Sequence, residues 1–224
     1  ALTDWLPETL PVYGLQAKIL SDGGIGHQSI REMAGCYVSA MRQVQPEGPY
    51  RLLGWSFGGV VVREMAAQLE AAALQVELMV LLDSPFGDEA ELQSQDQNQS
   101  KLLMQHADEL GIAHAGLSDM EIKAALLAEA GLLPNDANIN EIDLIIKAMM
   151  QAPSLILQHT DPNRLSCSII YVRANNNQST HLDEKLAAMT SGVVRIVDVD
   201  ATHARMCYAE NSKAVAAILV TSLC

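Results

Sequence analysis

The sequence predicts an α/β fold, in which a mainly parallel sheet is flanked by helices and interrupted by one long helical insertion. Strand, helix and strand patterns alternate between residues 50 and 83, and the alternation returns after residue 168. The 224 residues are 49% apolar, and the apolar residues are spread through the chain, which suits one sizeable buried core. We therefore expect a single domain spanning residues 1–224.

The first part of the chain supplies most of the predicted elements. A short β-prone run covers residues 11–16, and apolar residues at helical spacing begin after Ser29. The nearly continuous apolar run 50–55 predicts a strand that is buried on both faces. A helix over about 58–73 and a strand over 77–83 then complete a β-α-β unit.

The character of the sequence changes over residues 86–165. A polar, glutamine-rich stretch leads into helical patterns, and Ser118 with Glu121 matches a capping box at the start of one helix. Pro134 and Pro153 are expected to end other helices. We interpret the region as a helical lid, inserted between two strands where a substrate-covering segment would lie. Helices are expected near 99–111, 118–130 and 140–152.

The alternating pattern resumes after the insertion. Residues 168–174 and 193–199 have the composition of buried strands. A helical pattern follows each of them, near 179–190 and from 211 to 224. Two further strands are therefore expected in the same sheet.

Composition and charge exclude several functions. The net charge of −13 and the 14 scattered basic residues argue against nucleic-acid binding, which needs clustered Lys and Arg. No apolar stretch reaches the roughly 18 residues of a membrane span, and residues 1–10 lack the basic start of a signal peptide. The four cysteines form no C-x-x-C pair, which favours reduced thiols over disulfides or a metal site. We therefore expect a cytoplasmic protein without a metal and without membrane or nucleic-acid partners.

One motif carries chemistry. Residues 54–58 read GWSFG, a G-x-S-x-G match placed between an apolar strand and a helix, as in the nucleophile elbow of the α/β-hydrolase fold. Ser56 is then the candidate nucleophile, and the tight turn is expected to require that Gly54 and Gly58 lack a Cβ. The backbone N–H of Phe57, at the helix start, is the candidate oxyanion donor.

A serine nucleophile needs a base and an orienting acid. His203 follows the last predicted strand, which is where the base falls in this fold. Asp83 closes the strand after the elbow helix and is the favoured acid. The alternative position, the loop after Ala174, offers no carboxylate before Asp183. The remaining candidates, Asp198 and Asp200, lie too near His203 along the chain to orient it easily.

The elbow and its surroundings resemble the terminal, type I thioesterase domains of nonribosomal peptide and polyketide synthetases. The resemblance rests on VYGLQ at 12–16, the run from Met33 through PEGPYRLLGWSFGGVVVREMAAQL, LLDS at 81–84 and Thr202-His203, and covers the chain except the lid. It implies that Ser56, Asp83 and His203 form the triad. It further implies a substrate delivered on the phosphopantetheine arm of an acyl or peptidyl carrier domain, upstream in the same polypeptide, and no cofactor of the domain's own.

The resemblance also implies a first strand, or strands, and a loop with a second oxyanion donor upstream of Ala1, which this sequence does not contain. Several alternatives stay open. The chain could be a free-standing type II editing thioesterase or a small esterase, although such editing enzymes more often have His in place of Trp55. It could also be a non-catalytic module that binds a carrier. The resemblance implies a role in antibiotic or siderophore biosynthesis. The sequence does not identify the substrate, and it does not distinguish release by hydrolysis from release by macrocyclisation.

Overall fold

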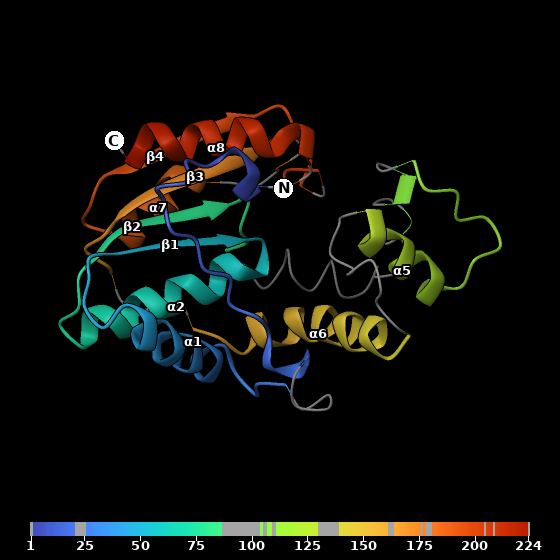
Figure 1. Ribbon diagram of the computed structural model, residues 1–224, viewed down its shortest axis with the longest axis horizontal. Helices are drawn as coiled ribbons and strands as arrows, with labels where there is room; N and C mark the ends of the chain where they lie inside the picture. Colours follow the sequence, from blue (N-terminus) through green and yellow to red (C-terminus); the bar gives the residue numbers. More distant parts are fainter. Residues whose placement is uncertain are drawn as a thin grey trace. The chain divides into compact units, whose positions relative to one another are not determined.

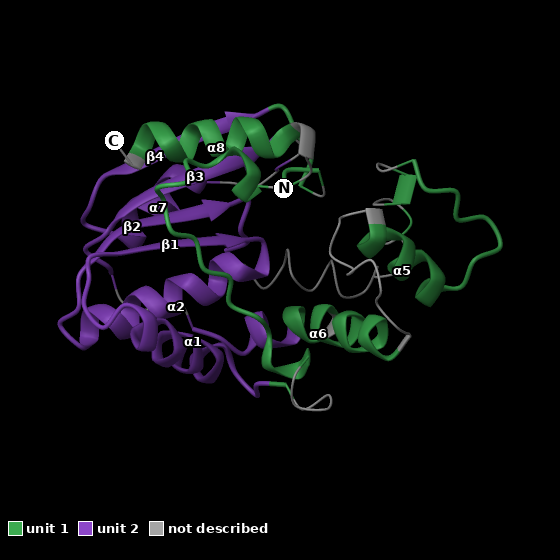
Figure 2. Cartoon of the chain, in the orientation of Figure 1, with its two compact units in different colours: residues 1–26, 89–153, 200–224 green, residues 27–88, 154–199 purple. Residues whose placement is uncertain are grey.

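The computed structural model divides the chain into two compact units, each assembled from segments that are distant in the sequence (Figure 2). The first unit comprises Ala1–Gly26, Glu89–Pro153 and Asp200–Cys224, and the second comprises His27–Asp88 and Ser154–Val199. The structure describes residues 2–20, 26–86, 104, 107–108, 111–129, 139–160, 164–175, 177, 181–203, 205–207 and 209–223.

The second unit is built around a four-stranded parallel sheet, whose strands follow one another in chain order across the sheet (Figure 1). All neighbouring strands run in the same direction, so their carboxyl ends share one edge, and the predicted parallel sheet is confirmed. The strands are β1 (Tyr50–Trp55), β2 (Val76–Leu82), β3 (Ser168–Ala174) and β4 (Val194–Val199).

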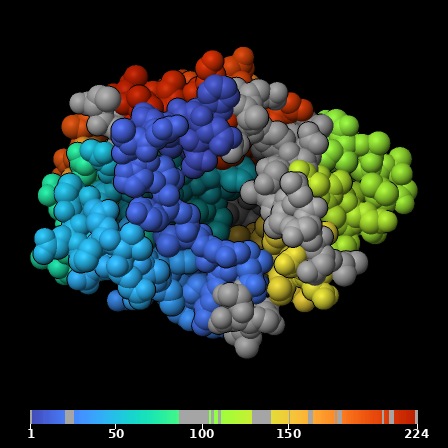
Figure 3. All heavy atoms as spheres, in the orientation of Figure 1, coloured from blue at the N-terminus to red at the C-terminus, as the bar shows by residue number. Residues whose placement is uncertain are grey.

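Helix α2 (Phe57–Ala71) packs against β1 and β2, and helix α1 (Ile30–Val44) packs against α2. Most residues of α2 are buried, because one side of the helix meets the sheet and another meets α1. Only the start of α1 is buried, and the rest contributes to the blue surface of this unit in Figure 3. A short helix, α7 (Leu182–Met189), precedes β4 and contacts it.

The start of α1 follows from local chemistry. Ser29 is the N-cap, and its hydroxyl accepts a hydrogen bond from the backbone N–H of Glu32 at 3.1 Å. The Glu32 carboxylate in turn accepts from the backbone N–H of Gln28 at 2.8 Å. The first bond satisfies an N–H group that the first turn of a helix leaves unpaired, and the second ties the preceding residue to that turn. Together they confirm the predicted helix start at Ser29.

The predicted burial of β1 on both faces is wrong. Residues along β1 alternate between buried and exposed, and Leu53 has 40% of its surface exposed. Arg51 on the same face pairs with Glu77 of β2 at 2.7 Å, with both side chains exposed. Helix α2 packs against β1, and the alternating burial pattern shows that only one face of the strand is covered.

Elements of the first unit are η1 (Leu2–Trp5), η2 (Lys18–Leu20), α5 (Asp119–Glu129) and α8 (Ala209–Leu223), and η1 packs against α8. In the described residues 11–16 the chain forms no strand, so that prediction is wrong. Helix α6 (Ile139–Leu157) begins in the first unit and ends in the second.

Four predictions about the insertion can be compared with the structure. The helices expected near 118–130 and 140–152 are confirmed as α5 and α6. The capping box is confirmed, since the backbone N–H of Ser118 donates to Glu121 at 2.8 Å and that of Glu121 donates to Ser118 Oγ at 3.3 Å. Pro153 does not end its helix, because α6 continues to Leu157. Helical hydrogen bonding resumes beyond the proline, where the backbone N–H of Gln158 donates to the carbonyl of Ser154 at 3.2 Å. The predicted helix at 99–111 falls largely outside the described residues, as does Pro134.

No helix in the described part of the chain is both long enough and apolar enough to cross a membrane. Three of the four cysteines, Cys36, Cys167 and Cys207, are free thiols in the structure. Cys36 is exposed, Cys167 is buried and Cys207 is half-buried. Burial raises the pKa of both Cys167 and Cys207 to about 11, which keeps these two thiols protonated at neutral pH.

The end of α2 is tied to the start of β3 by one carboxylate. Glu70 accepts hydrogen bonds from the backbone N–H of Ser166 at 3.0 Å, from its hydroxyl at 2.8 Å and from the backbone N–H of Cys167 at 3.1 Å. The carboxylate therefore fixes where β3 enters the sheet relative to the elbow helix.

We predict that Glu70→Ala lowers the free energy of unfolding by about 1–3 kcal/mol, because two backbone donors lose a charged acceptor. Glu77→Ala is the matched control, since it removes a surface ion pair and should change stability by less than about 1 kcal/mol. Urea titration followed by circular dichroism measures both. Equal losses for the two variants would contradict the role assigned to Glu70.

Candidate active site

Ser56 lies in a sharp turn between β1 and α2. Its backbone has φ of 50° and ψ of −124°, a conformation that a residue with a side chain rarely adopts. The turn is held on both sides: the backbone N–H of Ser56 donates to the carbonyl of Leu82 at 3.0 Å, and its own carbonyl accepts from Gly59 at 2.9 Å. Strain of this kind, held in place by the surrounding structure, is typical of functional sites.

The glycines around Ser56 are not equivalent. A Cβ on Gly54 would overlap the backbone of Gly58 and Gly59, so the tight turn requires glycine there. A Cβ on Gly59 would overlap the side chain of Ser84, so the absence of a side chain at this position lets the helix approach the sheet closely. Gly58 has no described atom within 4 Å of a built Cβ. The predicted steric requirement at Gly58 is therefore wrong, because a side chain at this position would meet open space among the described residues.

Phe57 is the first residue of α2. The N–H groups in the first turn of a helix have no partner within the helix, and the helix dipole adds partial positive charge there. Such a position can stabilise an oxyanion formed at Ser56. This role of Phe57 remains a prediction.

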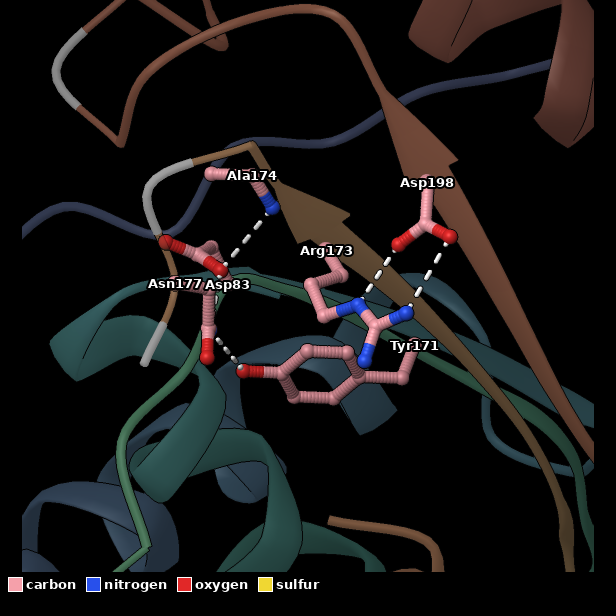
Figure 4. Close-up of polar contacts among 6 residues, drawn as sticks. All are labelled: Asp83, Tyr171, Arg173, Ala174, Asn177 and Asp198. Atoms are coloured by element: carbon pink, nitrogen blue, oxygen red, sulfur yellow. Dashed lines mark hydrogen bonds and ion pairs between the residues drawn. The ribbon is translucent and has the colours of Figure 1, made fainter. Parts of the chain in front are cut away.

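Asp83 directly follows β2, and in the sheet register Trp55 and Leu82, the residues preceding Ser56 and Asp83, are paired. The structure thus places the candidate nucleophile and the candidate acid on adjacent strand ends. Asp83 is buried, with 7% of its surface exposed, and its Oδ1 accepts from the backbone N–H of Ala174 at 3.1 Å (Figure 4).

A second donor to Asp83 was not predicted from the sequence. Asn177, beyond the end of β3, donates from Nδ2 to Asp83 Oδ1 at 2.5 Å and lies 3.2 Å from the hydroxyl of Tyr171 (Figure 4). Tyr171 is fully buried and donates to the carbonyl of Ser84 at 2.9 Å. Its pKa is raised, first by burial and then by the charge of Asp83, so the phenol stays protonated. The feature of the sequence that could have drawn attention to Asn177 is its position just after β3, the strand that pairs with β2.

The competing carboxylates are placed differently. Asp198 pairs with Arg173 across β3 and β4, at 2.5 and 3.1 Å, and 69% of its side chain is exposed (Figure 4). The hydrogen bond from Arg173 lowers the pKa of Asp198. Asp183 is exposed in the first turn of α7. Of the three candidate acids in the second unit, Asp83, Asp183 and Asp198, only Asp83 is buried, and it lies at the end of a strand.

His203 belongs to the first unit. It lies in a turn that follows β4 in the sequence and precedes α8, and it is half-buried. The backbone N–H of Arg205 donates to the carbonyl of Thr202 at 3.1 Å, and Asn211 Nδ2 donates to the carbonyl of Arg205 at 3.0 Å. These bonds fix the turn against the start of α8. Ser56 and Asp83 belong to the second unit, so the assignment of His203 as their partner remains a prediction.

Among the residues that the structure describes, no group of three or more His, Cys, Asp or Glu side chains is arranged to hold a metal ion.

The strand-elbow-helix arrangement and the parallel sheet are those of an α/β-hydrolase. A family model for the thioesterase domain matches residues 2–223, and the chain belongs to this family. Malpinin synthetase of Mortierella alpina is 49% identical over 84 residues, which are 38% of this chain and 1% of the synthetase. A dimodular nonribosomal peptide synthase of Bacillus subtilis is 46% identical over 74 residues, which are 33% of this chain and 3% of that protein. The chain thus spans only a few per cent of these relatives.

Solved structures of nonribosomal peptide synthetases have the same fold. The four-domain synthetase AB3403 superposes with a TM-score of 0.70 and 25% identity over 99% of this chain and 18% of that chain. The NocB thioesterase domain, solved as a covalent complex with a fluorophosphonate nocardicin G analogue, gives a TM-score of 0.61 at 24% identity over 94% and 81% of the two chains. The thioesterase domain SrfTE, which cyclises surfactin, gives 0.57 at 19% identity over 86% and 75%.

The two elbow glycines give a prediction of opposite sign. Gly54→Ala should lower the free energy of unfolding by about 1–3 kcal/mol, because its methyl group overlaps helix backbone that cannot move freely. Gly58→Ala should leave stability unchanged or raise it by up to about 1 kcal/mol, because the site is open and alanine restricts the unfolded chain. Thermal and urea unfolding measure both changes. A loss at Gly58 as large as that at Gly54 would contradict this geometry.

Proposed function

We propose that the chain is a serine thioesterase that takes an acyl or peptidyl chain from a carrier-protein phosphopantetheine thioester onto Ser56. The observation that carries the proposal is the conformation of Ser56, held at positive φ between a strand and a helix N-terminus. Ser56 lies at the start of α2, where the helix dipole adds partial positive charge, and the buried carboxylate of Asp83 lies at the end of the adjacent strand.

The reaction follows the chemistry of these groups. His203 accepts the Ser56 proton as the oxygen attacks the thioester carbonyl, and the N–H of Phe57 stabilises the resulting oxyanion. Collapse breaks the carbon–sulfur bond, and the pantetheine thiolate leaves as a thiol by taking the proton from His203. Asp83 orients the imidazole and stabilises its protonated form. Water or a nucleophile within the acyl chain then releases the product, by hydrolysis or macrocyclisation.

The proposed partner is a carrier domain, upstream in the same polypeptide, because the relatives named above are multidomain synthetases. The phosphopantetheine arm would belong to that carrier, and we propose no cofactor for this domain itself. We further propose that residues 1–224 act as one domain in the cytoplasm. Within it, residues 86–165 would form a lid that selects the acyl chain and controls the access of water.

Two alternatives make different predictions. A free-standing editing thioesterase or small esterase would release short acyl groups without a linked carrier. A non-catalytic carrier-binding module would keep the fold and leave Ser56 unreactive. A fluorophosphonate probe separates this last class from the enzymes, because only an activated serine forms the covalent adduct.

We predict that Ser56→Ala abolishes fluorophosphonate labelling and reduces thioester turnover by at least a thousandfold, since it removes the nucleophile. Folding should be retained, because the substitution removes one half-buried oxygen. Mass spectrometry of the adduct and thiol release from an acyl-pantetheine substrate measure the two effects. Turnover within tenfold of the wild type would end the assignment of Ser56.

Asp83→Asn should lower kcat by several powers of ten, about 10⁴-fold by comparison with the same change in another serine hydrolase triad. Asp198→Asn is the matched control, because this exposed carboxylate pairs with Arg173. The Asp198→Asn variant should have a kcat within about threefold of the wild-type value. Normal turnover in Asp83→Asn, with a collapse in the Asp198 variant or in Asp183→Asn, would move the role of the acid to that other residue.

A further inference from the structure

We propose that Asn177 is a positioning residue for the acid Asp83. The inference rests on the proposed function, since it assigns Asn177 a role in the reaction through the carboxylate of the proposed triad. It is motivated by the hydrogen bond from Asn177 Nδ2 to Asp83 Oδ1 and by the way the neighbouring groups fix the direction of that bond.

The direction of each hydrogen bond follows from the partners. The Tyr171 hydroxyl donates its proton to the Ser84 carbonyl at 2.9 Å. The hydroxyl oxygen of Tyr171 can therefore only accept a hydrogen bond from Asn177. An ionised carboxylate also only accepts. Both oxygens near Asn177 therefore require donors, and an amide NH₂ supplies two. The amide nitrogen, and not its oxygen, must face Asp83.

The network is suited to an ionised Asp83. The backbone N–H of Ala174 and the amide of Asn177 both donate to Oδ1, which sets the plane of the carboxylate through one of its oxygens. Ala174 and Asn177 come from the end of β3 and the chain just beyond it, while Asp83 follows β2. Two adjacent parallel strands thus contribute to one carboxylate, one by supplying it and the other by supplying its donors.

Tyr171 restricts the amide in turn. Its ring is fully buried and stacks on Phe86 with ring centres 5.8 Å apart. The guanidinium of the buried residue Arg63 lies 5.0 Å from the centre of the Phe86 ring. Because the ring is enclosed, its hydroxyl is a fixed point, and Asn177 is held between that point and Asp83. A preorganised partner of this kind reduces the orientations available to a catalytic group.

A double-mutant cycle tests the proposal. Asn177→Ala should lower kcat by roughly tenfold to a hundredfold, the equivalent of one hydrogen bond to a charged group, and leave KM within about twofold. In the Asp83→Asn background the same substitution should change kcat by less than about twofold, because a residue that acts through Asp83 has nothing left to position. The rate of Ser56 labelling by the fluorophosphonate should follow the same pattern.

A matched control separates positioning from stability. Thr190→Val removes buried hydrogen bonds to the carbonyls of Leu165 and Cys167, at the opposite end of β3, and should lower the melting temperature without lowering kcat. If Asn177→Ala does not fold, Tyr171→Phe serves in its place. It keeps the ring and removes the oxygen that holds the amide, and should lower kcat by roughly threefold to tenfold with the same loss of effect in Asp83→Asn.

The outcomes distinguish the two proposals. A wild-type protein without turnover or labelling would overturn the proposed function, and the role of Asn177 with it. A slow Asp83→Asn variant beside a fully active Asn177→Ala variant would overturn the role of Asn177 alone. So would an equal loss from Asn177→Ala in the wild-type and Asp83→Asn backgrounds, since a residue of merely structural importance lowers both alike.

Discussion

The register between β1 and β2 is the constraint on which the rest of the site depends. Trp55 pairs with Leu82, so the chain leaves both strands at the same level, and the backbone N–H of Ser56 bonds to the carbonyl of Leu82. A shift of one residue in either strand would turn Ser56 or Asp83 to the other face of the sheet. Leu82 also pairs with Val172, so the end of β3 is aligned with the ends of β1 and β2. The donors to Asp83 come from the end of β3 and the chain just beyond it.

The strain at Ser56 is sustained by the packing beneath it. A non-glycine residue at positive φ costs of the order of 1–3 kcal/mol. Helix α2 offsets this cost, because it is buried along most of its length against β1, β2 and α1. Its approach to the sheet is limited by Ser84, whose side chain occupies the space that a methyl group on Gly59 would need. The elbow is therefore a property of the whole β1-α2-β2 unit and not of the five-residue motif alone.

Local patterns allowed most of the second unit to be predicted. The bounds of β1 and β3, the start of α1 at Ser29 and the elbow at Ser56 depend on neighbours along the chain, and the sequence displays these directly. Features that depend on tertiary surroundings were missed. The exposure of Leu53 depends on which face of β1 is covered in the folded chain, and the open space at Gly58 depends on the atoms that surround the folded turn.

The candidate site shows the same division. Ser56 and Asp83 could be placed at one sheet edge, because parallel strands bring their carboxyl ends together. Asn177 could not be identified, since it takes part in the site as a donor to a carboxylate that follows the neighbouring strand, and an amide side chain in a loop does not by itself indicate such a role. The partnership of Asp83 and Asn177 spans 94 positions of the sequence, and no local pattern indicates it.

The direct pairing of β2 with β3 has a consequence for how such a domain can diversify. The chain leaves the sheet after Leu82 and returns at Ser168, yet these two strands are hydrogen-bonded neighbours. The entropy of closing a loop rises only with the logarithm of its length, by about 0.6 kcal/mol for each doubling. The segment between the two strands can therefore change in length and sequence during evolution at a small cost in folding free energy. The pairing of β2 with β3, and with it the position of Asp83 beside its donors, would be kept while the intervening segment changes.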